Sequence, residues 1–116
     1  MIETVLLNHI KTELANKSLS IPVYFEIPAN PPVEFIIIER TGGRFDNYLY
    51  RSTFAFRSYA ATLAEAAALD EIIVGIVEDS VKQKEISQAR LNSHYNYTDT
   101  STKKYRYQAV FDFVHY

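Results

Sequence analysis

Residues 51–84, RSTFAFRSYAATLAEAAALDEIIVGIVEDSVKQK, decide the fold because two hydrophobic periods meet in them. From Arg51 to Tyr59, phenylalanines alternate with polar or small residues, which is typical of a half-buried strand. From about residue 62 to 84, apolar residues recur at helical spacing behind a Thr62 and Glu65 capping box. A strand that runs directly into a long helix predicts a sheet with that helix packed on it.

The part of the chain before this stretch predicts one helix and two strands. Its apolar residues first follow a helical period and then fall into two short runs that are rich in isoleucine, valine and aromatic residues. Three prolines separate these two runs, and both faces of the second run are apolar, which indicates a central strand. The predicted segments are a helix over 2–16, strands over 23–27 and 33–40, a break at 41–44 and a polar-aromatic connection over 45–50.

The last third predicts two strands, 86–97 and 104–114, joined by a polar loop over 98–103. On the first of them, Tyr95 and Tyr97 share the parity of the apolar residues, and His94 lies on the other side. The element order is therefore helix, three strands, helix, two strands. We expect a single α+β domain over 1–116, with a mainly antiparallel sheet of about five strands and both helices packed on one face.

Composition narrows the possible functions. The chain has 116 residues and a formal net charge of −2, which argues against an extended nucleic-acid surface, and it has no cysteine, which excludes thiolate chemistry and Cys-ligated metals. His9, His94 and His115 fall on separate segments without metal-ligand spacing, and Gly42 and Gly43 lack a phosphate-binding context. We expect no enzyme activity, no catalytic residues, no cofactor and no bound metal.

Targeting signals are also lacking in the sequence. The N-terminus carries Glu3 and no basic stretch before an apolar run, unlike a secretory signal. The apolar runs are all far shorter than the ~20 residues of a membrane span. We expect a protein that is made in the cytoplasm and has no membrane partner.

The second face of the predicted sheet favours contact with other protein chains. The residues predicted to lie opposite the core are Ile36, Ile38, Arg51, Arg57, Val110 and Val114. Two helices packed on one face of the sheet cannot also cover this second face. A solvent-exposed sheet face is the alternative interpretation.

A nucleic-acid module is a second alternative, because Lys103-Lys104-Tyr105-Arg106-Tyr107 mixes basic and aromatic residues. That function requires exposed Tyr105 and Tyr107, whereas their alternation with Phe111 predicts that they extend the core face. We therefore expect no specific nucleic-acid partner.

The layout of the chain resembles a known group of proteins along nearly its whole length. The resemblance lies in the helix from Met1 to Leu14, the proline-rich turn at 28–32 followed by Phe-Ile-Ile-Ile-Glu-Arg, the RSTFAFRSY strand that runs into an alanine-rich helix, and the closing YRYQAVFDF strand. In these features the chain is similar to the tail terminator or tail-to-head joining proteins of tailed bacteriophages, and to relatives described as minor capsid or tail-completion proteins.

The resemblance implies a structural virion protein. Such a subunit would form a homo-oligomeric ring, usually a hexameric one, that caps the tail tube and joins it to the head connector. Its partners would be other copies of itself, the tail-tube protein and the head-connector protein, and its final location would be the neck of a phage or prophage virion. A head-completion protein of the same neck region is the alternative that the sequence leaves open.

Candidate interface positions follow from residue type, because aromatic residues and arginines are favoured as interface anchors, whereas lysines suit a rim. We expect replacement of Arg57 by Glu to leave the monomer folded and to weaken assembly. The candidate interface residues are Tyr48, Tyr50, Arg51, Arg57, Lys103, Lys104 and Arg106.

Overall fold

The computed structural model describes residues 1–116, apart from the side chain of Asp46. The predicted α+β fold is confirmed: five strands and two helices follow in the predicted order. The elements are α1 (Ile2–Asn16), β1 (Val23–Tyr24), β2 (Phe35–Asp46), β3 (Leu49–Ala60), α2 (Leu63–Glu78), a 3₁₀ turn η1 (Asp79–Lys82), β4 (Ile86–Asn96) and β5 (Tyr105–His115).

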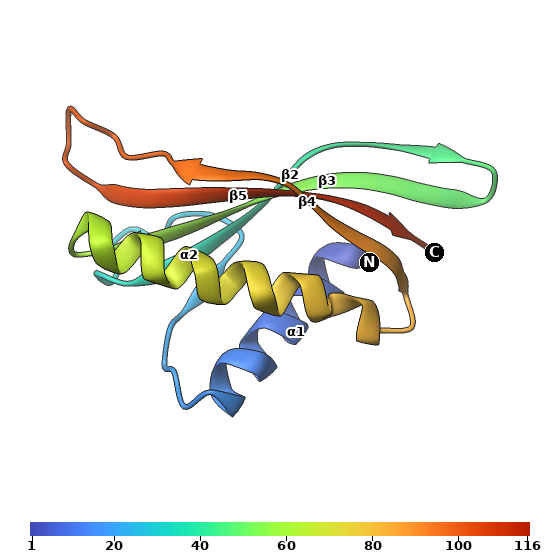
Figure 1. Ribbon diagram of the computed structural model, residues 1–116, viewed down its shortest axis with the longest axis horizontal. Coiled ribbons are helices and arrows are strands. Elements are labelled where there is room, and N and C mark those ends of the chain that lie inside the picture. The colour runs from blue at the N-terminus through green and yellow to red at the C-terminus, as the bar shows by residue number, and fades with distance from the viewer.

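One twisted sheet forms one layer of the molecule, and both helices lie on the same side of it (Figure 1). The strand order is β1-β2-β3-β5-β4; β1 pairs in parallel with β2, and the other pairs are antiparallel. The hairpin between β2 and β3 projects at one end of the long axis, and the loop between β4 and β5 projects at the other (Figure 1).

The core lies between the sheet and the helices. Phe54 and Phe56 of β3 are fully buried beside Phe111 and Phe113 of β5, with edge-to-face ring contacts at 5.7 and 5.8 Å. Edge-to-face pairs of this kind add about 0.5–1.5 kcal/mol to the free energy gained by burial. The helices close the core from below with Leu6, Ile10, Leu14, Leu69, Ile73, Ile76 and Val77.

The predicted break at 41–44 and connection over 45–50 are wrong, because β2 runs through Asp46 and β3 begins at Leu49. Asn47 and Tyr48 have φ values of 51° and 65°, as the two central residues of a type I′ hairpin turn do. Gly43 permits close strand packing, since a Cβ there would come within 2.8 Å of the carbonyl oxygen of Arg51.

Other boundaries also shift. The strand predicted over 23–27 ends at Tyr24, and α2 ends at Glu78, with one 3₁₀ turn in place of the predicted continuation to residue 84. The predicted faces of β2 are wrong as well: Ile36 and Ile38 belong to the core under the helices, and Phe35 and Ile37 lie on the other face of the sheet.

Candidate interaction surface

The face of the sheet turned away from α1 and α2, called the open face here, brings four strands side by side (Figure 1). One row of residues across it is Ile37 on β2, Arg57 on β3, Gln108 on β5 and Tyr95 on β4. The face therefore mixes apolar, cationic and aromatic side chains within one rigid sheet.

A hydrogen-bond network spans all four strands in that part of the face. The Arg57 guanidinium forms an ion pair with Glu39 and donates a hydrogen bond from Nε to Oε1 of Gln108 at 2.8 Å. Gln108 in turn donates from Nε2 to the hydroxyl of Tyr95 at 2.6 Å. Because Arg57 and Gln108 are largely buried, these bonds hold the strands together and leave little of either side chain for a partner.

Arg106 extends this network toward the β4–β5 loop. Its Nε donates to the carbonyl oxygen of Tyr97 at 2.6 Å, its Nη1 donates to the hydroxyl of Tyr59 at 3.0 Å, and its guanidinium lies 4.6 Å from the centre of the Tyr97 ring. Tyr59 stacks on Phe35 at 4.3 Å in a small buried cluster. We call this region, made of Glu39, Arg57, Tyr59, Tyr95, Tyr97, Arg106 and Gln108, the network half.

A β-bulge brings the two tyrosines of β4 into this network. The register of β4 against β5 shifts between Leu91 and Ser93, so that Tyr95 pairs with Gln108 on the open face. The prediction that Tyr95 and Tyr97 share the face of the apolar residues of β4 is therefore wrong, because one extra residue reverses the parity of everything after it. His94 correspondingly turns toward α2, where its Nδ1 lies 2.7 Å from Oδ2 of Asp70.

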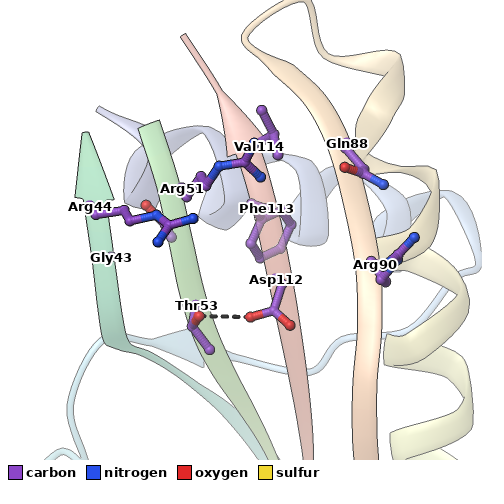
Figure 2. A pocket seen from close by; sticks show the side chains of 10 residues that line it. Gly43, Arg44, Arg51, Thr53, Gln88, Arg90, Asp112, Phe113 and Val114 are labelled. Carbon is purple, nitrogen blue, oxygen red and sulfur yellow. Dashed lines mark hydrogen bonds between the residues drawn. The ribbon is translucent and has the colours of Figure 1, made fainter. Parts of the chain in front are cut away.

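The other end of the open face is hollowed. Figure 2 shows Arg44 of β2 beside Arg51 of β3, and Arg90 of β4 on the other side of Asp112 of β5. The hollow that these residues line has a volume of about 420 Å³. The Asp112 carboxylate accepts hydrogen bonds from Thr53 at 2.7 Å and from Asn92 at 3.1 Å. Among the described side chains, no carboxylate forms an ion pair with any of these three arginines. We call Arg44, Arg51, Thr53, Arg90 and Asp112 the hairpin half.

Exposed aromatic residues stand next to this half. Tyr48, at the tip of the β2–β3 turn, is 91% exposed, and Phe45 is 60% exposed. Tyr50 stacks on His115 at 5.4 Å on the helix side of the sheet, and His115 lies 2.7 Å from the Ser52 hydroxyl. Burial lowers the pKa of His115, so its imidazole is held neutral at physiological pH.

The β4–β5 loop forms the opposite end of the molecule. Lys103 and Lys104 are exposed there, beside a largely apolar groove of about 240 Å³ that also includes Ile27, Val33 and Tyr59. Hydrogen bonds from Ser101 and Thr102 lower the pKa of Asp99 in the same loop to about 2.

The seven candidate residues thus fall in three places. Arg51 belongs to the hairpin half and Tyr48 to the adjacent turn, with Tyr50 beside them on the helix side of the sheet; Arg57 and Arg106 belong to the network half, and Lys103 and Lys104 lie on the far loop. Of the hairpin half, only Arg51 was among the candidates, so the sequence analysis missed its two other arginines. Arg90 was indicated by its alternation against Ala89 and Leu91, whereas Arg44 was hidden in the predicted break.

Polar groups on the helix side serve packing. His9 donates from Nε2 to the carbonyl oxygen of Ile76 at 2.8 Å, which ties α1 to α2. Burial of the Asp70 carboxyl on the inner side of α2 raises its pKa, against the opposing effect of the His94 hydrogen bond. Tyr105 and Tyr107 are half-buried, which does not favour the nucleic-acid interpretation.

Metal ligands, membrane helices and similarity to known proteins also bear on function. Within the described part of the chain, no three histidine, aspartate or glutamate side chains gather as metal ligands would. Among the helices that the structure describes, none has the length and hydropathy that crossing a membrane requires. Comparison of the sequence with models of known protein families and with curated proteins finds no match.

Proposed function

We propose that the chain is a structural protein of a bacteriophage or prophage virion, which forms an oligomeric ring at the head–tail joint. In that role it caps the tail tube and joins it to the head connector. The observation that carries the proposal is the hairpin half, where three arginines without a partner among the described side chains lie beside an exposed aromatic turn. Arginine and tyrosine are the residues most enriched at energetically important interface positions.

The form of the subunit supports a ring. The molecule measures 43 × 30 × 25 Å, with the β2–β3 hairpin and the β4–β5 loop at opposite ends of its long axis (Figure 1). A ring subunit at a joint must contact its neighbours and also two different partners, one on each side. Projecting ends suit the tail tube and the head connector, while the broad faces remain for neighbouring copies. The layout shared with tail terminator proteins supports the same assignment.

The first test is the mass of the purified protein by light scattering over a concentration series, together with negative-stain imaging. We expect rings of about six subunits, or about 80 kDa, and attachment of those rings to the ends of purified tail tubes. A protein that stays at 13.4 kDa at every concentration, and in the presence of tail tubes, would contradict the proposal.

A second experiment separates the tail-capping role from the alternative head-completion position in the neck. Pull-downs with purified tail-tube protein and purified head-connector protein, in parallel, identify the primary partner. Retention by the connector alone would move the subunit to the head-completion position and overturn the tail-capping role.

A further inference from the structure

The outer side of α2 differs in charge from the open face of the sheet. Glu71 and Glu78 are exposed on the side of α2 turned away from the sheet, and no described side chain forms an ion pair with either. Asp79 at the end of this helix is also exposed, and it pairs only with Lys82 at 3.6 Å. This side is therefore acidic, whereas the hairpin half is cationic.

The same side of α2 permits close approach. Between the two glutamates lies Gly75, which is exposed, and a Cβ added there would meet nothing within 4 Å in its own subunit. Gly75 therefore permits no close contact that its own subunit uses. Ala64 and Ala68 continue this low surface toward the start of the helix.

We propose that a second copy of this chain occupies the open face. The hairpin half of one copy docks on the outer side of α2 of the other copy. The argument is charge complementarity: Arg44, Arg51 and Arg90 on one surface face exposed Glu71 and Glu78 on the other. The inference rests on the proposed ring and names the two surfaces that build it.

The placement of these surfaces makes the contact head-to-tail. The open face and α2 lie on opposite sides of the molecule (Figure 1), so a copy that uses its open face on one neighbour still presents α2 to the next. Such heterologous contacts propagate, and they close into a ring when the rotation between copies allows it.

Charge reversal provides the test. One variant carries Arg51→Glu and Arg90→Glu, and a second carries Glu71→Lys and Glu78→Lys. Each alone places like charges across every contact, and we expect the concentration needed for half-assembly to rise about tenfold or more. When the two variants are mixed one to one, every contact between alternating copies is again complementary, so the mixture regains the wild-type mass.

Controls separate this inference from the proposed function. Lys11→Glu on α1 with Lys17→Glu at the residue that ends this helix makes the same charge change on exposed positions, and we expect wild-type assembly from it. Circular dichroism verifies the fold of every variant. If the wild-type protein forms rings and both reversal variants assemble as well as it does, the docking inference is overturned and the proposed ring is not. If the wild-type protein stays monomeric, the docking inference and the proposed ring are both overturned.

Two more outcomes are decisive. If the arginine variant keeps its oligomeric mass but loses retention on a double-stranded DNA column, the occupant is a polyanion and the inference fails. Gly75→Gln supplies a second measurement, because glutamine favours a helix and should raise the melting temperature. We expect that variant to assemble less than wild type, and an unchanged assembly threshold would contradict the docking on α2.

Discussion

The network half and the hairpin half of the open face are built on the same strands and both carry arginines, but their arginines are used differently. Arg57 forms an ion pair with Glu39 and a hydrogen bond with Gln108, so its charge is paired within the subunit. Arg51 is paired in register with Arg44 and Val114, neither of which can neutralise it. Cross-strand neighbours therefore decide whether an arginine of this face holds the sheet together or remains for a partner.

The largest expected difference between the halves concerns tyrosines. Tyr59 is buried and stacked on Phe35 in the network half, so Tyr59→Ala should lower the free energy of unfolding by about 3 kcal/mol. The control is Tyr48→Ala at the exposed hairpin turn, where we expect a change under about 0.5 kcal/mol. Urea unfolding of the monomer measures both, and equal losses would contradict the division of the face.

The arginines give the next largest effect. Arg57→Glu would lose the hydrogen bond to Gln108 and place a second carboxylate beside that of Glu39. We expect the free energy of unfolding to fall by about 2 kcal/mol. The sequence analysis expects Arg57→Glu to leave the monomer folded, and the structure adds that the folded monomer should be less stable. Arg51→Glu is the matched variant, with a change within about 0.5 kcal/mol. If urea midpoints show that Arg51→Glu is the more destabilising, the two halves are assigned the wrong way round.

A smaller effect is expected at the hairpin turn. Tyr48 has a φ of 65°, a left-handed conformation that glycine adopts without strain and that the second position of a type I′ turn favours. Tyr48→Gly should therefore be more stable than Tyr48→Ala by about 0.5–1 kcal/mol in thermal or urea unfolding. Alanine isolates the backbone effect because it also lacks the ring; a less stable glycine variant would argue against this turn.

The smallest effect is the pH dependence from His115, beneath the hairpin half. Burial lowers its pKa from the ordinary value of 6.5, so the unfolded chain binds the proton more readily than the folded one. The free energy of unfolding should then fall as the pH drops through 6.5. His115→Gln retains hydrogen bonding to Ser52 and should show a shallower fall between about pH 7.5 and about pH 5.5. Identical slopes for the two proteins would refute this effect.

Much of the fold could be predicted from local patterns. The alternation of β3 and its direct passage into α2 are visible in the sequence, and the Thr62 hydroxyl accepts a hydrogen bond from the Glu65 amide as a capping box requires. The bulge after Leu91 in β4 was not predictable, because a single extra residue there leaves no compositional mark and yet reverses which side chains reach the open face. The β2–β3 turn was missed since its residues are Asn-Tyr rather than Asn-Gly.

The candidate surface was harder to predict than the fold. Residue type alone selected Arg51 and Arg57 together, although only register and neighbours distinguish them. Arg44 and Arg90 come from strands distant in sequence, and only the sheet topology places them around one hollow with Arg51. Such sets depend on long-range pairing, which no local pattern encodes.

The most direct test of this account is arginine modification by phenylglyoxal, read by mass spectrometry in dilute and in concentrated wild-type protein. We predict that Arg44, Arg51 and Arg90 react in the dilute monomer and become protected as the mass rises, while Arg57 and Arg106 react weakly in both states. Unchanged reactivity of the three hairpin-half arginines on assembly, or a protein whose mass never rises, would contradict the account.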